Sequence, residues 1–214
     1  MAYRDLDALR SDWRQRRQEI ARRLSHFRRF RTAPDEVLFH ELASCLFAIQ
    51  TSARRSDDAV RALAADGTLW HGTVEDIALI LRRRVRFHNH KAAYLVAARE
   101  RFIAGSASLR AWVDSMPPTV AREQLVREVD GFGYKEASHF LRNVGRGEAF
   151  AILDRHVLKN LHRHGVIRSV PEALSRKQYL AIEERVRGFA GAVTVPMAAL
   201  DLLFWSRETG EVFK

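Results

Sequence analysis

Two glycines separated by one residue, Gly131 and Gly133, interrupt a helical pattern that resumes directly after them. Apolar residues recur at helical spacing on both sides, with Val120, Leu125, Val126 and Val129 before the glycines and Ala137, Phe140, Leu141 and Val144 after them. So short a connection leaves room only for a tight turn, and glycine readily adopts the positive φ angles that a tight turn needs. The segment is therefore predicted to form two helices joined by a hairpin, with positive φ at both glycines.

The hairpin is also expected to bind phosphate and to present a lysine. Backbone N–H groups at a turn that opens a helix bind anions, because the helix dipole adds positive charge there. The groups of Gly131 and Gly133 are the expected donors. Lys135 follows in the first helical turn, where the same dipole disfavours its charged form. An uncharged lysine amine can act as a nucleophile, so Lys135 is a candidate catalytic residue.

Each of these residues also has an ordinary structural interpretation. A glycine pair before a helix is typical of a plain turn between two helices. Asp154 precedes the apolar residues Val157 and Leu158, so its carboxylate is suited to cap a helix. Spacing alone is compatible with two interpretations. In the first, the glycines form a plain turn and Asp154 caps a helix. In the second, the hairpin, Lys135 and Asp154 together form a functional site.

Composition favours a nucleic-acid partner. The 214 residues include 36 Lys and Arg against 26 Asp and Glu, which gives a net charge of +10. Such an excess favours a polyanion, with nucleic acid ahead of a membrane surface. The single cysteine, Cys45, excludes a disulfide within the chain and a four-thiolate iron–sulfur cluster. The first residues do not resemble a signal peptide, and no apolar run approaches about 18 residues, so a soluble cytoplasmic protein is expected.

Helical periodicity recurs along the chain and no strand pattern or internal repeat accompanies it. The expected helices cover residues 5–30, 37–49, 56–65, 74–84, 85–104, both sides of the hairpin, and two more between 175 and 208. The fold is predicted to be all-α, with two helical subdomains. Residues 1–60 plus 165–214 are assigned to a terminal subdomain and residues 61–164 to the helix-hairpin-helix subdomain. The cleft between them is the expected substrate site.

A longer run of residues resembles a known family. It comprises Gly133-Tyr134-Lys135-Glu136-Ala137 and its continuation to Gly145, then Ala151 to His156. The run is similar to the archaeal-type (type 2) 8-oxoguanine DNA glycosylase/AP lyase of the helix-hairpin-helix DNA glycosylase superfamily. Bifunctional members carry a lysine just after the hairpin and an aspartate at this separation, which implies that Lys135 and Asp154 are catalytic. Asp130 departs from the pattern, because these hairpins commonly carry proline there.

The resemblance implies excision of a damaged base followed by cleavage of the strand. The lesion nucleotide is flipped out of the stack, and the carboxylate of Asp154 stabilises the positive charge that develops on the sugar. The amine of Lys135 attacks C1′, expels 8-oxoguanine and leaves a Schiff base, from which β-elimination nicks the strand.

The implied partner is double-stranded DNA containing 8-oxoguanine, bound by a monomer at the nucleoid of a prokaryotic cell. No catalytic metal or redox cofactor is expected. Related hairpins hold a monovalent cation on backbone carbonyls, here those of Arg127, Val129 and Phe132, and such an ion serves DNA binding only.

Four residues are expected at the base pocket. Phe87 lies in a basic loop that resembles an Arg-Phe segment of the same family, where it either stacks on a base or packs under its own loop. Gln50 ends a segment comparable to one near the family's pocket, with an ordinary helix end as the alternative. In the family the chain ends in lysine, nine residues after a tryptophan, as Lys214 follows Trp205 here. The terminal carboxylate accepts the N7 proton of 8-oxoguanine, and Trp205 and Phe87 sandwich the ring.

Two other functions fit parts of the sequence. A monofunctional glycosylase for alkylated bases uses the aspartate alone, and Lys135 is then incidental. A non-catalytic helix-hairpin-helix DNA-binding module accounts for the charge and the glycines, but not for an aspartate at the position of Asp154.

Overall fold

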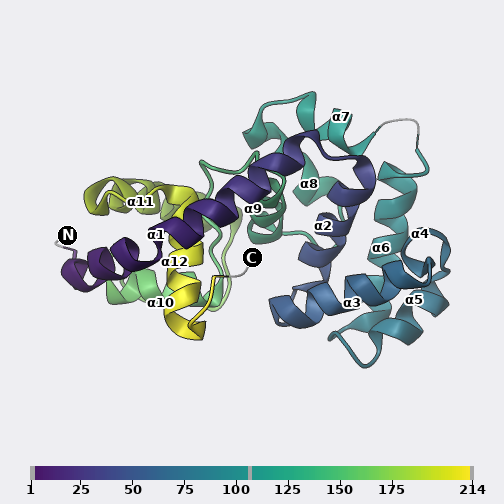
Figure 1. Cartoon of the computed structure of the whole chain (residues 1–214), viewed down its shortest axis with the longest axis horizontal. Helices are drawn as coiled ribbons and strands as arrows, with labels where there is room; N and C mark the ends of the chain where they lie inside the picture. The colour runs from purple at the N-terminus through teal and green to yellow at the C-terminus, as the bar shows by residue number, and fades with distance from the viewer. Residues whose placement is uncertain (1–2, 106–107, 213–214) are drawn as a thin grey trace.

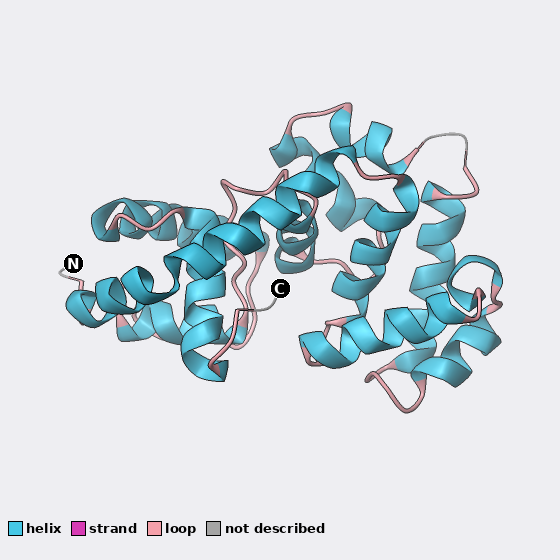
Figure 2. Cartoon of the chain, viewed as in Figure 1, coloured by secondary structure: helices cyan, strands magenta, loops and turns pink. Residues whose placement is uncertain are grey.

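The computed structural model describes residues 3–105 and 108–212, and these residues form helices and loops without a strand (Figure 2). The predicted all-α class is confirmed. The elements in chain order are α1 (Leu6–Arg29), the 3-10 turn η1 (Phe30–Thr32), α2 (Asp35–Phe47), α3 (Ala53–Ala65), α4 (Thr68–His71), α5 (Val74–Leu81), α6 (His88–Phe102), α7 (Leu109–Asp114), α8 (Pro118–Glu128), α9 (Tyr134–Asn143), α10 (Arg155–Arg163), α11 (Arg176–Val193) and α12 (Met197–Thr209).

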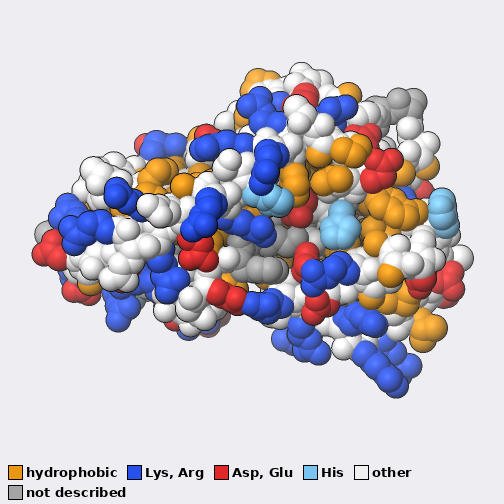
Figure 3. Space-filling model, viewed as in Figure 1, with side chains coloured by type: hydrophobic (Ala, Val, Ile, Leu, Met, Phe, Trp, Pro, Cys, Tyr) orange, Lys and Arg blue, Asp and Glu red, His pale blue; other side chains and the backbone are white. Residues whose placement is uncertain are grey.

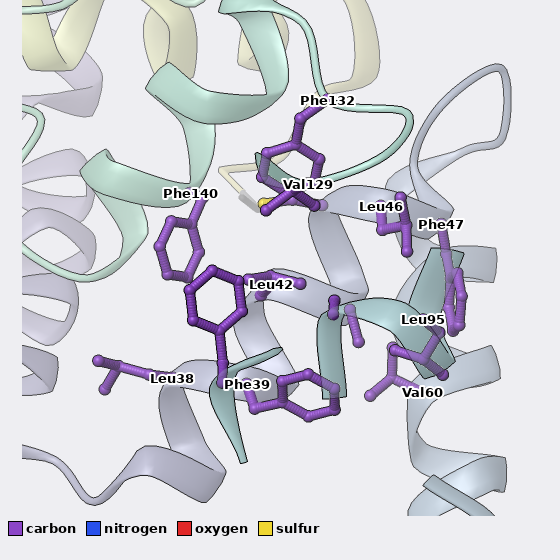
Figure 4. Packing of buried hydrophobic residues seen from close by; sticks show 14 of the residues in the cluster. Leu38, Phe39, Leu42, Leu46, Phe47, Val60, Leu95, Val129, Phe132 and Phe140 are labelled. Carbon is purple, nitrogen blue, oxygen red and sulfur yellow. The ribbon is translucent and has the colours of Figure 1, made fainter. Parts of the chain in front are cut away.

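The first hydrophobic core is built around α2. This helix is apolar almost all round, so it is stable only where other helices cover every side of it. In Figure 4 the hairpin residues Val129 and Phe132, together with Phe140 of α9, lie around Leu42 of α2. The hairpin is therefore held against α2 by buried side chains, which fixes the start of α9 in space.

The second core joins the N-terminal helix to the C-terminal ones. Leu9 and Ile20 of α1 pack with Leu161 of α10, Phe189 of α11 and Phe204 of α12. Figure 1 shows α1 extending from the half of the molecule that holds α10, α11 and α12 to the half that holds α2 and α8. Two packing units are therefore present, and α1 passes from one to the other.

The limits of the two cores differ from the predicted ranges of the subdomains. Along the chain, buried residues change from the second core to the first between Phe27 and Leu38, and back again between Phe150 and Ala151. The predicted changes lie at residues 60 and 165 instead. The difference arises because α2 and α3 pack with the hairpin, while α10 packs with the terminal helices.

Among residues 3–105 and 108–212, no single helix is long and apolar enough to cross a membrane, and α11 and α12 meet the length and composition criteria only as a pair bent by 85°.

Candidate active site

The hairpin between α8 and α9 depends on one glycine for its turn. Gly131 has φ +84°, and a Cβ there would lie 2.9 Å from Cδ2 of Tyr94, so both conformation and space require glycine. Gly133 has φ −106° and ψ −172°, which is extended backbone. The predicted positive φ is confirmed at Gly131 and wrong at Gly133. A single left-handed residue already reverses the chain, and Gly133 instead serves as the N-cap of α9.

The carboxylate of Glu136 occupies the start of α9. Its Oε2 accepts a hydrogen bond from the backbone N–H of Gly133 at 3.2 Å, and its Oε1 lies 3.4 Å from Nζ of Lys135. The N–H of Gly133, an expected phosphate donor, therefore already has an acceptor within the chain. The same carboxylate therefore contacts both the N-cap of α9 and the side chain of Lys135. The position of Glu136 three residues after the N-cap was the signal for this contact in the sequence.

A cavity of about 980 Å³ lies between the two cores, at the predicted cleft. Its wall combines the loop between α2 and α3 with parts of α9, α10 and α12. Five of the candidate residues line it, namely Gln50, Gly133, Lys135, Asp154 and Trp205. The side chain of Lys135 is 24% exposed, so a molecule in the cavity can reach its amine.

Asp154 is the N-cap of α10 as well as part of the cavity wall. Its Oδ1 accepts a hydrogen bond from the backbone N–H of Val157 at 2.7 Å. The structural interpretation of Asp154 as a helix cap is therefore confirmed. The cap uses one of the two carboxylate oxygens, which is compatible with a second role for the other.

Buried side chains of α11 hold the extended segment that leads to Asp154. The hydroxyl of Tyr179 donates to the carbonyl of Ala151 at 2.6 Å and accepts from the N–H of Leu153 at 3.3 Å. Oε1 of Glu183 accepts from the N–H of Ala151 at 2.9 Å. Because these bonds fix the backbone just before α10, they fix where the carboxylate of Asp154 lies.

A buried ion pair completes this support. Arg122 of α8 donates to both oxygens of Glu183, at 2.7 and 2.9 Å, and the two side chains are 5% and 6% exposed. The guanidinium also lies over the ring of Phe150, 4.0 Å from its centroid. The pair thus joins α8, the first helix of the hairpin, to α11, which holds the segment before Asp154.

Glu183→Gln is expected to lower the free energy of unfolding by about 3 kcal/mol, because it leaves the buried Arg122 charge without its counterion. Denaturant unfolding at neutral pH measures the loss. The neighbouring residue provides the control, since Glu184 pairs with Arg187 at 3.1 Å but is 75% exposed. Glu184→Gln is expected to cost less than about 0.5 kcal/mol. Equal losses in the two variants would contradict the assigned importance of the buried pair.

The cavity wall contains a second carboxyl that the sequence analysis did not place in the site. Asp201 of α12 lines the cavity one turn before Trp205, and its Oδ2 lies 3.0 Å from a guanidinium nitrogen of the buried Arg142. Burial raises the pKa of Asp201, the charge of Arg142 opposes the rise, and the charge of Asp154 adds to it. The two carboxyls therefore interact. An acidic residue within the apolar first part of this helix was the available signal.

Phe87 is not among the described residues that line the cavity. Phe87 is 49% exposed with φ +56°, and the guanidinium carbon of Arg86 lies 5.4 Å from its ring centroid. Its exposure is as expected, but the structure does not bring it to the cavity beside Trp205, and the sandwich of the base between the two rings stays a prediction. Phe213 and Lys214 lie outside the described residues.

The carbonyl groups expected to hold a monovalent cation lie at the turn. The carbonyl of Val129 accepts the N–H of Phe132 at 3.0 Å, which leaves its second lone pair for an ion. Val129 has an extended conformation at the end of α8, so its carbonyl is not part of the regular helix. The carbonyl of Val129 is suited to such an ion, and the site with Arg127 and Phe132 stays a prediction.

Comparison with known proteins relates the chain to one family. A sequence model described as 8-oxoguanine DNA glycosylase matches residues 20–195. An 8-oxoguanine DNA glycosylase/AP lyase of Fusobacterium nucleatum is 42% identical over 176 residues, which cover 81% of each chain, and one of Methanocaldococcus jannaschii is 37% identical over 196 residues, which cover 91% of each.

The solved structures give the same result. The 8-oxoguanine DNA glycosylase of Methanocaldococcus jannaschii superposes with a TM-score of 0.87 at 34% identity, over 98% of this chain and 95% of that one. The same organism's enzyme in complex with a 15mer DNA containing 8-oxoguanine gives a TM-score of 0.86 at 33% identity, over 97% and 100% of the two chains. With sequence and fold alike along nearly its whole length, the chain belongs to the 8-oxoguanine DNA glycosylase family.

Proposed function

We propose that this protein excises 8-oxoguanine from double-stranded DNA and then cleaves the strand at the resulting abasic site. The observation that carries the proposal is the presence of Lys135 and Asp154 in the wall of one cavity. A nucleophilic amine and a carboxylate at the same cavity are the two groups that this chemistry needs. The family supplies the substrate, because a relative was solved with DNA containing this lesion.

In the proposed reaction the C1′–N9 bond breaks as the amine of Lys135 bonds to C1′. The bonding electrons leave with the base, which takes up a proton, and the carboxylate of Asp154 stabilises the positive charge on the sugar. The amine must lose a proton, and the Glu136 carboxylate, 3.4 Å from Nζ, is placed to accept it. Opening of the sugar ring gives the Schiff base. Loss of a C2′ proton then breaks the C3′–O bond and nicks the strand.

The cavity also supplies groups for the base itself. Its volume of about 980 Å³ suits a flipped nucleotide, and Trp205 and Gln50 in its wall are proposed to stack on and hydrogen-bond to the base. The described end of the chain passes beside the cavity, since Thr209 lines it and Glu211 pairs with Arg54. This supports the proposal that Lys214, further along the chain, contacts the flipped base.

Borohydride trapping tests the proposed reaction. The wild-type protein is expected to form a covalent adduct with a duplex containing one 8-oxoguanine, because borohydride reduces the Schiff base to a stable amine. A monofunctional glycosylase would release the base without an adduct, and a DNA-binding module would do neither. The position of Lys135 in the same cavity wall as Asp154 favours the bifunctional enzyme over both.

Arginine side chains beside the cavity are proposed to contact the DNA backbone. Arg55, Arg82, Arg83, Arg84 and Arg86 line a second hollow of about 360 Å³, which shares Gln50, Thr51 and Ser52 with the main cavity. Figure 3 shows further Lys and Arg side chains spread over both halves of one face. The proposed active form is one monomer on one duplex, acting at the nucleoid of a prokaryotic cell.

Binding to the lesion duplex is expected to weaken steeply with salt, because each phosphate contact releases condensed counterions. A log–log slope of about −4 or steeper is expected for several contacts. Fluorescence anisotropy between low and moderate salt measures it, with Arg83→Gln and Arg84→Gln together as the variant that reduces the slope. A flat dependence would argue against DNA as the partner.

A further inference from the structure

The buried cation Lys91 is not used by the proposed reaction. This α6 side chain is 2% exposed. Its Nζ donates to the carbonyls of Phe47 and Ile49, each at 2.7 Å, and to Oγ1 of Thr51 at 3.1 Å. All three donors of the ammonium are therefore satisfied by the last residue of α2 and the loop that follows it. Burial lowers the pKa of Lys91 to about 8, with contributions from Arg86 and Lys135, so this cation is kept at a cost.

The loop that Lys91 binds forms part of the cavity. Residues 48–52, here called the cavity loop, all line the main cavity. Gln50 lies in this loop with φ +52°, a conformation that residues other than glycine adopt rarely. Lys91 contacts Ile49 and Thr51, the residues on either side of Gln50. Its hydrogen bonds therefore hold the backbone where Gln50 is strained.

The same contacts reach a second loop. Residues 82–87, here called the arginine loop, carry four of the arginines beside the cavity and end at Phe87, which also has a positive φ. Oγ1 of Thr51, which accepts from Lys91, also accepts from the backbone N–H of Arg86 at 3.3 Å. One lysine and one threonine thus join both loops, and each loop contains a strained residue with a role assigned at the DNA.

We propose that Lys91 is a positioning residue for base excision, which holds the cavity loop and, through Thr51, the arginine loop in the geometry that receives the flipped base. The inference rests on the proposed function. Binding of the base needs both loops in place, whereas attack of Lys135 on a sugar that has already lost its base does not. Lys91 should therefore matter for excision of 8-oxoguanine and much less for cleavage at an abasic site.

A second cation of α6 provides the matched control. Arg99 donates to the carbonyls of Leu69 and Gly72, at 3.3 and 2.8 Å, and so also holds a loop by two main-chain contacts. That loop does not line the main cavity. Lys91→Met and Arg99→Met each replace a cation bound to carbonyls with an unbranched apolar side chain. If the two variants lose a similar amount of melting temperature, a difference between their reaction rates cannot be due to destabilisation of the fold.

The experiment compares two substrates for each variant under single-turnover conditions. Lys91→Met is expected to slow excision of 8-oxoguanine by about 30-fold, within the roughly 100-fold that a 1 Å misplacement can cause, and to change cleavage of a preformed abasic site by less than about threefold. Arg99→Met is expected to stay within about threefold of the wild type on both substrates. If Lys91→Met does not fold, Thr51→Val removes the hydroxyl that accepts from both Lys91 and the Arg86 N–H, keeps the two carbonyl acceptors of Lys91, and is expected to slow excision selectively.

Each outcome decides between the interpretations. The role of Lys91 would be overturned if folded Lys91→Met excised 8-oxoguanine as fast as the wild type, or if its rate fell equally on both substrates. Either outcome would leave the proposed function intact. An equal loss of excision in Arg99→Met would do the same. A wild-type protein that cleaves abasic sites but releases no 8-oxoguanine would overturn the proposed function and this inference together.

Discussion

Lys135→Gln is expected to abolish base release and strand cleavage while leaving DNA affinity within about tenfold of the wild type. The glutamine amide cannot form a Schiff base, so the covalent step is lost outright. DNA affinity changes little because phosphate contacts across the surface dominate binding. Gel analysis of an oligonucleotide containing 8-oxoguanine measures both activities, with alkali treatment revealing bases released without strand cleavage.

A second lysine provides the control that distinguishes loss of the nucleophile from loss of one positive charge. Lys159 is exposed on α10 and does not line the cavity, so Lys159→Gln removes the same charge without touching the reaction. Its rate is expected to equal that of the wild type. A borohydride-trapped adduct that persists in Lys135→Gln would show that another amine is the nucleophile.

Asp154→Asn is expected to reduce the rate of base excision by about 10²- to 10³-fold, since it removes the negative charge opposite the developing positive charge of the sugar. The fold should survive, because asparagine also accepts the Val157 N–H at the start of α10 and caps helices about as well as aspartate. A melting temperature near that of the wild type, measured by circular dichroism, would confirm that the cap is retained.

Asp35 offers the comparison for this variant. Its carboxylate accepts the backbone N–H groups of Leu109 and Arg110 at the start of α7, away from the cavity. Asp35→Asn therefore changes a helix-binding aspartate without changing the site, and excision should be unaffected. If Asp154→Asn turned over as fast as the wild type, capping would be the whole role of Asp154.

The parts of the site that depend on neighbours in sequence were predictable. The turn at Gly131, the position of Lys135 in the first turn of α9 and the cap by Asp154 follow from local spacing, and the structure has all three. Gly133 was mispredicted because a glycine is compatible with several conformations. The carboxylate of Glu136, three residues further on, selects the extended one.

The parts that depend on distant packing were not predictable from a single sequence. Lys91 lies in a polar stretch that suggests a surface lysine, and only the end of α2 brings three acceptors to its amine. Asp201 lies in an apolar stretch, and its place in the wall depends on how α12 packs against α9 and α10. The extent of each core depends on the same distant packing, since nothing local shows that α2 packs with the hairpin.

The boundary between the two cores passes between the two catalytic candidates. Lys135 extends from α9, whose buried face belongs to the first core, and Asp154 follows Leu153 of the second. The separation between amine and carboxylate is therefore a measure of how one half of the molecule is oriented toward the other. A small molecule that contacted both walls would act on this separation without touching either reactive group. Inhibitors of this enzyme need not resemble a base at all.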